Sequence, residues 1–297
     1  MRIIHRLLQK KPNFTSKPLA EKLQQIDKRI MSAQPGEIPL LLNDIPIDIF
    51  GNLLLDVPAQ YPNIKAFFPS MPPDEIQDQW TGNHGPTLLA ASLAFTKTMV
   101  AGYTELTGKD LKNSVVLDYG CGWGRLIRLL YKYVPHENIY GVDPWDRSID
   151  LCKQYGVKAR LAISDYVPEA LPFENQFDLI FAFSVFTHLS EKTAKTVLST
   201  LRKYIRDDGI LVITIRPKKY WSLYKQGKVK NEMFQIHEEK GFAFIPHQRA
   251  PIDGDITYGD ASISLGYMEE NFHQWELARV ITNRVDPHQT VVFLRPA

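Results

Sequence analysis

Three glycines at alternate positions, Gly120, Gly122 and Gly124, break an apolar stretch of the chain. The residues before them, Ser114 to Tyr119, form a short apolar run that is typical of a buried parallel strand. Beyond the glycines, large apolar residues recur at helical spacing. A strand, a tight turn and a helix in this order place backbone N–H groups at the carboxyl edge of a sheet, where open α/β sheets bind nucleotide-like ligands.

The glycine spacing narrows the choice of ligand. A dinucleotide-binding fingerprint has glycine at the first, third and sixth positions, but here the third glycine stands fifth and the sixth position is Arg125. A pyrophosphate is therefore disfavoured. We expect a ligand with one carboxylate, which meets backbone N–H groups, and one ammonium, which meets carbonyl groups or Asp118.

The stretch from Val115 to Gly124 resembles motif I of the class I S-adenosylmethionine (SAM)-dependent methyltransferases, in which an apolar strand and an acidic residue precede GxGxG. A glycine cluster can also serve turn geometry alone, so this motif needs support from other parts of the chain. The resemblance implies that SAM is the cofactor. It assigns cofactor contacts to Asp118, Gly120, Cys121, Gly122, Gly124 and Arg125.

Three later stretches follow the same family pattern. A short apolar strand from Asn138 to Val142 ends at Asp143, where a carboxylate can accept both hydroxyls of a ribose. The resemblance implies that Asp143 and Pro144 hold the ribose and that Ser164 and Asp165 lie at the adenine. It also implies that Phe183 and Ser184, at the end of a fourth strand, border the site of methyl transfer.

The alternation of apolar elements predicts an α/β fold, because strands separated by helical segments of about a dozen residues form βαβ units. We expect a Rossmann-like, doubly wound, mostly parallel seven-stranded sheet with an antiparallel last strand. The predicted elements after the glycines are helix 146–155, strand 158–163, strand 177–183, helix 191–205, strand 210–215, helix 267–278 and a strand pair at 279–284 and 290–294.

The pattern divides the chain into an N-terminal extension, residues 1–70, and a methyltransferase domain, residues 71–297. Within the extension, 19–31 carries a helical apolar stripe, and 38–57 alternates apolar clusters with Pro, Asn and Asp. Such an apolar segment needs a partner surface. It either packs on the main domain or forms a subunit contact in a homodimer.

A polar and aromatic loop, Gln79 to Gly85, precedes a long predicted helix at 86–107. Helices just before motif I commonly cover the cofactor in this family, so the loop, including His84, could line the substrate or the methionine end. The alternative is an ordinary helix start with Asn83 near the cap. A second candidate for covering the site is the segment 217–262, which is irregular in sequence and which we predict to be a substrate lid.

Methyl transfer from SAM requires alignment of the acceptor with the methyl group, and removal of a proton when the acceptor is a hydroxyl. His188 follows the fourth strand on the loop expected to lie nearest the methyl, so it is the first candidate for a base or an acceptor-positioning residue. The alternative is a loop histidine that fixes the backbone before a helix cap at Ser190. The weaker candidates for the base are His84, His237 and Tyr258.

The amino-acid composition narrows the possible partners and the location of the protein. A net charge of +2 is too small for a nucleic-acid partner, and the composition, 44% hydrophobic and 23% charged, indicates a globular chain without a membrane span. The two cysteines, Cys121 and Cys152, give neither a disulfide framework nor metal-ligand spacing. We therefore expect no metal and a cytoplasmic location. Residues 1–8 are interrupted by His5 and Arg6 and show no signal-peptide cleavage site.

Motifs that are missing from the sequence narrow the class of methyl acceptor. The fourth strand leads into Phe183 to Phe186 rather than the Asn/Asp-Pro-Pro-Tyr/Phe sequence of many amino-directed methyltransferases, and no cysteine stands where a pyrimidine-methylating nucleophile would. We expect transfer to a hydroxyl of a small molecule, such as a sugar or secondary metabolite, as in the bacterial enzymes that the Ser184 to Leu189 run resembles. A peptide or protein methyltransferase and a non-catalytic SAM-binding partner protein are the alternatives.

Overall fold

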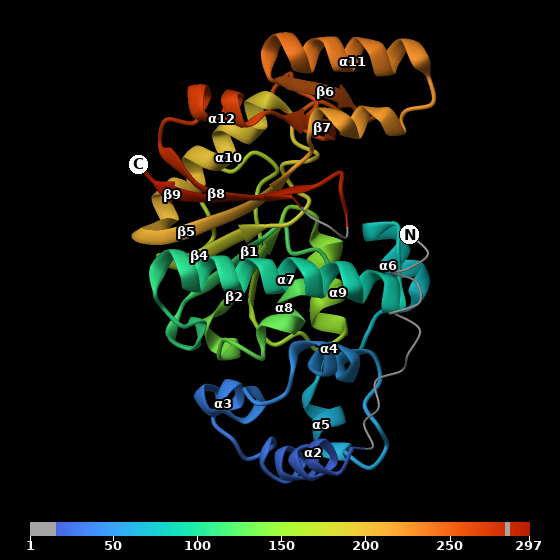
Figure 1. The fold of residues 1–297 in the computed structure, drawn as a ribbon, viewed down its shortest axis with the longest axis vertical. Helices are drawn as coiled ribbons and strands as arrows, with labels where there is room; N and C mark the ends of the chain where they lie inside the picture. The colour runs from blue at the N-terminus through green and yellow to red at the C-terminus, as the bar shows by residue number, and fades with distance from the viewer. Residues whose placement is uncertain (1–15, 283–285) are drawn as a thin grey trace.

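The computed structural model describes residues 16–282 and 286–297, and its centre is a seven-stranded sheet (Figure 1). The strand order is β3-β2-β1-β4-β5-β9-β8, with β1 to β5 parallel and β9 antiparallel to both of its neighbours. The predicted doubly wound sheet is confirmed. The strands are β1 Val116–Tyr119, β2 Ile139–Asp143, β3 Arg160–Ile163, β4 Phe177–Ala182, β5 Ile205–Ile215, β8 Trp275–Thr282 and β9 Thr290–Pro296.

The central strands are buried on both faces, which explains their continuous apolar sequence. Successive side chains point to opposite faces, so Val116 of β1 joins one hydrophobic cluster and Leu117 joins the other. Helices α7, α8 and α9 cover the first face, and α10 and α12 cover the second (Figure 1). Their bounds are α7 Gly85–Thr107, α8 Arg125–Leu130, α9 Asp146–Gln154, α10 Glu191–Tyr204 and α12 Leu265–Asn271.

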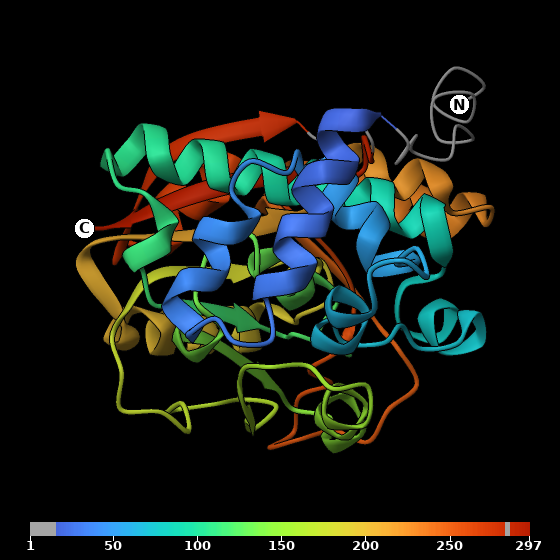
Figure 2. The same cartoon turned by 90° about the horizontal axis from the view of Figure 1, so that it is seen from below.

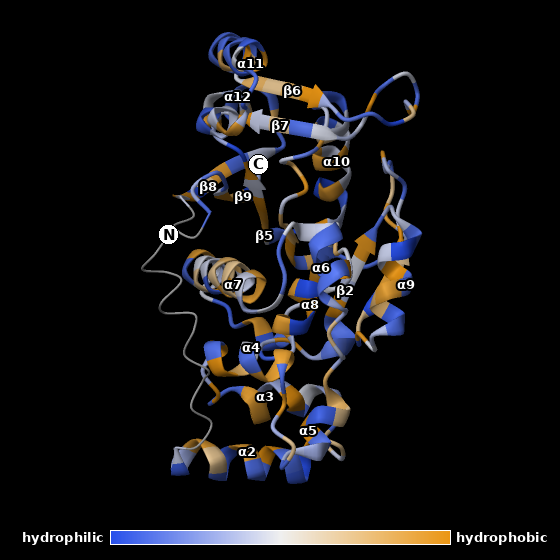
Figure 3. Cartoon of the chain, turned by 90° about the vertical axis from the view of Figure 1, so that its right-hand side faces the viewer, coloured by the Kyte–Doolittle hydropathy of each residue, from blue (hydrophilic) through white to orange (hydrophobic). Residues whose placement is uncertain are grey.

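The described part of the N-terminal extension packs on the main domain. Its buried residues share one hydrophobic cluster with α7 and α8; Gly51 of the extension, for example, lies against the side chains of Leu89 and Leu93 of α7. Figure 2 shows these helices crossing in front of the sheet, and Figure 3 shows the apolar colouring of α3 and α4. The elements of the extension are α2 Lys17–Arg29, η1 Pro35–Glu37, α3 Ile38–Leu42, α4 Ile47–Leu55 and α5 Pro62–Phe67, and the main domain begins with α6 Asp74–Thr81.

The segment 217–262 is more regular than we predicted. It forms a 3₁₀ turn, a helix and a two-stranded antiparallel sheet that stands beyond the carboxyl edge of the main sheet (Figure 1). The helical pattern is weak in sequence because only Met233 and His237 of the helix are buried. The elements are η4 Lys218–Leu223, α11 Gly227–Lys240, β6 Phe242–Pro246 and β7 Gly259–Ile263.

The predicted helix at 267–278 is wrong in its second half. Helix α12 ends at Asn271, and Trp275 begins β8, which pairs with β9 over the whole of its length. The apolar residues of β8 pack on the sheet at one edge, and over so few residues their spacing also fits a helix. The expected strand at 279–284 extends into residues 283–285, which lie outside the described residues. Residues 1–15 also lie outside them, and so does the predicted absence of a signal peptide.

No single helix among the described residues is long and apolar enough to cross a membrane; the pair 35–42 and 47–55, bent by 115°, meets the length and composition criteria only when combined. Within the same residues, no group of three or more His, Cys, Asp or Glu side chains could hold a metal ion.

Candidate functional site

The glycine loop joins β1 to α8, and its three glycines all adopt positive φ angles of 77°, 53° and 78°. The backbone N–H groups of Gly120 and Cys121 both donate to the carbonyl of Val142 in β2, at 2.8 and 2.9 Å. A β-carbon on Gly120 would lie 2.5 Å from Cγ2 of Val185. Glycine at 120 is therefore required both by its φ angle and by the approach of the loop that follows β4.

Asp143 ends β2 beside this loop. Its Oδ2 accepts the backbone N–H of Gly122 at 2.9 Å, and its Oδ1 accepts that of Trp145 at 3.0 Å. Burial raises the pKa of Asp143, and the backbone hydrogen bonds from Trp145 and Gly122, with a further bond from the Ser148 side chain, oppose that rise. A carboxylate has about four lone-pair positions, so these bonds leave acceptor capacity for a ligand hydroxyl. Pro144 continues the turn from Asp143 to Trp145.

Asp118 lies in β1, immediately before the loop, and is 2% exposed. Burial raises the pKa of its carboxyl group well above the ordinary value, and the charge of Arg125 opposes this. Arg125 donates to Oγ of Ser92 in α7 at 2.7 Å, and its guanidinium lies 5.0 Å from the ring centroid of Phe183. Arg125 and Phe183, both predicted cofactor contacts, thus pack together toward α7.

An aromatic stack covers the loop from the side of α6. The Trp80 and Trp145 rings are nearly parallel, at 14° and 4.6 Å between centroids, and Nε1 of Trp80 donates to Oγ of Ser148 at 3.1 Å. Cδ1 of Trp80 would lie 3.2 Å from a β-carbon on Gly122, so the indole sits directly over the middle glycine. The guanidinium of Arg147 lies 5.0 Å from the Trp80 ring.

Apolar side chains are exposed where β2 and β3 end. Trp145 is 41% exposed, Ile163 52% and Tyr166 41%, and their strands are neighbours in the sheet. Between them, Ser164 is buried and its Oγ has no hydrogen-bond partner among the described residues, whereas Asp165 is exposed. A planar ligand with polar edges suits such a surface. Ser164 and Asp165 were predicted as cofactor contacts, whereas Trp145 and Tyr166 were not. The available signal for these two was an aromatic residue shortly after a predicted strand.

The loop after β4 is the predicted acceptor side of the site. Ser184 has a φ of 61°, unusual for a residue with a side chain, and strain of this kind occurs often at functional sites. Its N–H donates to Oγ1 of Thr214 at 2.7 Å, and its hydroxyl lies 3.2 Å from that of Thr187. These bonds, from the neighbouring strand β5 and from within the loop, hold the strained turn in place.

His188 is fixed by hydrogen bonds at both ring nitrogens. Nδ1 lies 2.7 Å from the carbonyl of Gly259, which only accepts, so Nδ1 carries the proton. Nε2 lies 3.1 Å from Nη2 of Arg216 and accepts a hydrogen bond from it. Burial lowers the pKa of His188 to about 4, and the charge of Arg216 adds to this. The imidazole is thus neutral, with no nitrogen free to take a proton from an acceptor in this arrangement.

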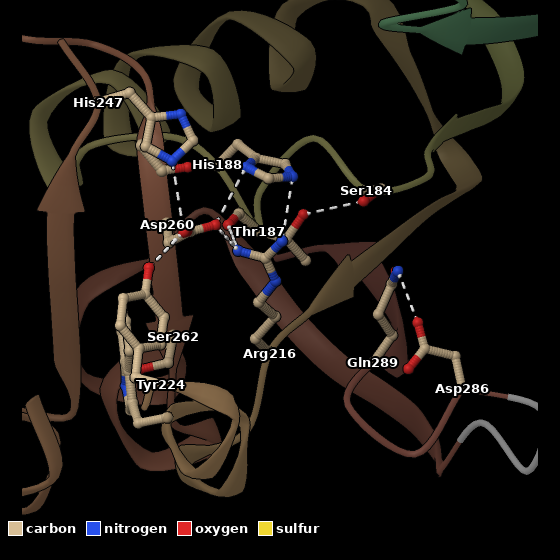
Figure 4. A network of polar contacts seen from close by, with 12 residues as sticks. Ser184, Thr187, His188, Arg216, Tyr224, His247, Asp260, Ser262, Asp286 and Gln289 are labelled. Atoms are coloured by element: carbon tan, nitrogen blue, oxygen red, sulfur yellow. Dashed lines mark hydrogen bonds and ion pairs between the residues drawn. The ribbon is translucent and has the colours of Figure 1, made fainter. Parts of the chain in front are cut away.

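Asp260 of β7 organises the network around His188 (Figure 4). Its Oδ1 accepts from Arg216 at 2.6 Å, while its Oδ2 accepts from the hydroxyl of Tyr224 and lies 3.3 Å from Nε2 of His247. Burial alone would raise the pKa of Asp260, but the bond from Tyr224 and the charge of Arg216 outweigh it and hold the pKa at about 2. The carboxylate is therefore ionised and fully engaged.

Tyr258 stands beside this network, because residue 258 pairs with Leu189 in an antiparallel bridge. Its ring stacks on that of His188 at 4.9 Å and 5°, and the guanidinium of Arg249 lies 4.3 Å from its centroid. Segment 217–262, the predicted substrate lid and from here on the lid segment, thus lies against the loop after β4, and its role as a lid stays a prediction. The pairing of Arg216 with Asp260 was missed, since the two residues are 44 positions apart and no local pattern connects them.

The two other histidines considered as bases lie elsewhere. His84 caps α7, is half exposed, and pairs through Nδ1 with Asp78 at 2.9 Å. His237 is buried on α11, where Nδ1 lies 2.7 Å from the hydroxyl of Ser262. The hydroxyl of Ser262 also accepts from the Trp221 indole, so His237 belongs to the packing of the lid segment on its own sheet.

The residues present fit SAM. A buried carboxylate at Asp118, with no hydrogen bond from another described side chain, suits an ammonium group. The unpartnered hydroxyl of Ser164 and the exposed rings of Trp145 and Tyr166 suit the polar edge and the faces of a purine. Asp143, which lies between the positions that suit the ammonium group and the purine, has lone pairs left to accept the hydroxyls of a ribose.

Comparison with known proteins finds a family model described as a methyltransferase domain, which matches residues 116–209. The uncharacterized protein MJ1252 of Methanocaldococcus jannaschii is 31% identical over 113 residues, 37% of this chain and 41% of that protein. The ubiquinone biosynthesis O-methyltransferase of Pelagibacter ubique is 28% identical over 107 residues, 35% of this chain and 43% of that enzyme. The chain thus matches about two fifths of the length of these curated relatives.

A solved structure of a S-adenosylmethionine-dependent methyltransferase from Clostridium acetobutylicum aligns with a TM-score of 0.47 and 13% identity, over 69% of this chain and 91% of that chain. The segment matched by the family model runs from β1 to the first part of β5 and includes the glycine loop, Asp143 and the loop after β4. Residues 116–209 of this chain therefore match a methyltransferase domain.

Proposed function

We propose that this protein transfers the methyl group of SAM to an oxygen atom of a small-molecule acceptor, with a hydroxyl of a sugar or secondary metabolite as the expected acceptor group. The observation that carries the proposal is the convergence of the glycine loop, Asp143 and the loop after β4 at one edge of the sheet, inside the segment that matches the methyltransferase domain. The similarity to an O-methyltransferase supports oxygen as the acceptor atom.

Each half of the site has a separate task in this proposal. Asp143 binds the ribose hydroxyls, Asp118 faces the ammonium group, and Ser164 and Asp165 face the adenine, against the rings of Trp145 and Tyr166. When bound, SAM supplies a methyl group made electrophilic by the positive sulfur. Because that activation is built into the cofactor, the protein has mainly to align the acceptor and exclude water.

On the acceptor side, His188 is proposed to position rather than to accept a proton. Both of its nitrogens are bonded, and its low pKa makes it a weak base. The loop from Ser184 to His188 and the ring of Tyr258 then form the surface on which the acceptor rests. A hydroxyl of ordinary acidity would lose its proton to solvent or to a rearranged His188, so acceptors that ionise readily suit this site best.

The test is a calorimetric titration of the purified protein with SAM, with its demethylated product S-adenosylhomocysteine (SAH), and with NAD as a control. Micromolar binding of SAM and SAH without binding of NAD is the expected result. Absence of SAM binding would contradict the proposal. Binding of SAM without methyl transfer across a broad acceptor screen would favour the non-catalytic alternative. The cytoplasmic location and a homodimer contact through the N-terminal extension stay predictions, and light scattering tests the second.

A further inference from the structure

The lid segment carries an excess of positive charge. Between residues 216 and 249 the chain has eight Lys and Arg residues against three Glu residues, a net charge of +5, whereas the whole chain has +2. A concentration of one sign of charge beside a cleft attracts ligands of the opposite sign. The rest of the chain is correspondingly acidic, so the excess belongs to this segment and not to the protein in general.

Most charged groups near the acceptor side already have partners. Arg216 is paired with Asp260, and Lys218 of η4 is paired with Glu238. Asp260 also accepts from Tyr224, and its Oδ2 lies 3.3 Å from His247. These groups therefore hold the lid segment together and offer little to a ligand.

Arg249 is the exception. It follows β6 on the loop that leads to β7, its side chain is exposed, and it forms no ion pair or hydrogen bond with the described residues. Its guanidinium nevertheless has a defined place, 4.3 Å from the ring centroid of Tyr258, whose ring also stacks on His188 at 4.9 Å. Stacking on an aromatic ring leaves the edge of the guanidinium, with its N–H donors, free for bidentate bonds to an oxyanion.

The Tyr258 ring connects this cation to the place of reaction. Gly259, the next residue, donates to the backbone carbonyl of His188 at 2.8 Å, so the ring stands against the loop that follows β4. Burial raises the pKa of the Tyr258 phenol, and the charges of Arg249 and Arg216 oppose that rise. An acceptor lying along this ring would have one end at Arg249 and the other near the methyl group.

We propose that the acceptor is an organic anion, a carboxylate or a phosphate ester, whose charged group is bound by Arg249 at the face of Tyr258. This inference rests on the proposed function, because it names the class of acceptor for the same site.

The experiment titrates the SAH complex of the full chain with three probes of similar shape, benzoate, phenyl phosphate and the neutral benzyl alcohol. We expect at least one anion to bind at millimolar concentration, about tenfold more tightly than benzyl alcohol. Benzoate and phenyl phosphate distinguish the two kinds of anion. Equal binding of the neutral probe, or no binding of either anion, would overturn the proposal.

Three variants locate the binding. Arg249→Gln should weaken the anion about tenfold, and Arg249→Lys should restore part of that loss because it returns the charge without the planar fork. Lys228→Gln, an exposed lysine on α11, is the matched control and should change affinity by less than about twofold. Equal weakening by Arg249→Gln and Lys228→Gln would indicate general electrostatic attraction and sink the assignment. Each sample is first titrated with SAH, so failure of cofactor binding is seen separately from failure of the anion site.

Discussion

The carboxylate of Asp143 accepts the backbone N–H of the glycine-loop residue Gly122 at 2.9 Å, which ties the end of β2 to the turn after β1. The same side chain accepts the N–H of Trp145 and so also fixes the start of the turn toward α9. One carboxylate therefore shapes both walls of the pocket proposed for the nucleoside. Its removal should affect ligand binding through direct contact and through the shape of the loop.

For this reason we expect Asp143→Ala to weaken SAM binding by about 2 to 4 kcal/mol, the value of a charge-assisted pair of hydrogen bonds. Asp143→Asn keeps one acceptor oxygen and should lose less. Calorimetric titration of both variants with SAM measures the effect, and circular dichroism confirms that each is folded. If the alanine variant kept wild-type affinity, the ribose would have to lie elsewhere.

The close approach of Gly120 to Val185 predicts a loss of stability. A methyl group at position 120 would meet Cγ2 of Val185 at 2.5 Å, in addition to the strain of a φ of 77°. Gly108→Ala is the matched control, because Gly108 has a φ of 68° but no atom within 4 Å of the added carbon. We expect urea unfolding to show a loss of about 1 kcal/mol for Gly108→Ala and about 2 kcal/mol more for Gly120→Ala. Val185→Ala should recover part of that extra loss, and equal losses in the two glycine variants would refute the contact.

The glycine loop could be predicted because its chemistry is local. A strand, three glycines and a helix lie within a few residues of one another, and the acid after the next strand follows from the rule that parallel strands end at the same edge. The same alternation predicted a mostly parallel sheet, and the resemblance implied its antiparallel last strand, whereas the strand order is known from the structure. The identity of the cofactor came from the resemblance to a known family. The glycine spacing alone predicted only a ligand with a carboxylate and an ammonium group.

The acceptor side could not be predicted in this way. The partners of His188, which are Gly259 and Arg216, come from segments that meet only after β7 packs beside the loop after β4. The residue type suggested a base, whereas burial beside a guanidinium lowers the pKa of this histidine and ties up both nitrogens. Helix α11 was missed for a related reason, since its apolar side is covered by a small sheet and the amphipathic signal is weak.

The position of Trp80 predicts that its ring affects the entry and release of the cofactor. Its ring lies over Gly122 and stacks on Trp145, so a nucleoside entering beside Asp143 must displace or share this stack. We expect SAH to change the tryptophan fluorescence of the wild type, and Trp80→Phe to remove most of that change. Trp80→Ala should speed SAH dissociation about tenfold in stopped-flow displacement, because the cover of the loop is lost. Trp221→Phe, in the lid segment, is the control for the loss of an indole. A dissociation rate that Trp80→Ala does not change would show that α6 does not cover the ligand.

The low pKa of His188 predicts how stability depends on pH. The ring is neutral in the folded protein down to about pH 4, whereas in the unfolded chain it takes up a proton near pH 6.5. Because the unfolded state binds more protons in this window, its contribution to stability is present above pH 6.5 and is lost as the pH falls toward 4. The shift corresponds to about 3 kcal/mol.

His188→Asn should therefore lose less stability than the wild type between neutral pH and about pH 5, as measured by urea unfolding at both. The control is His84, whose contribution to stability depends on pH in the opposite direction. The hydrogen bond and charge of Asp78 raise the pKa of the exposed His84, so its contribution is present at low pH and is lost as the pH rises through the folded-state pKa. His84→Asn should thus make the protein slightly more sensitive to acid. If His188→Asn kept the acid sensitivity of the wild type, the ring would have to be charged or exposed in the folded state, and its proposed role in positioning the acceptor would fail with it.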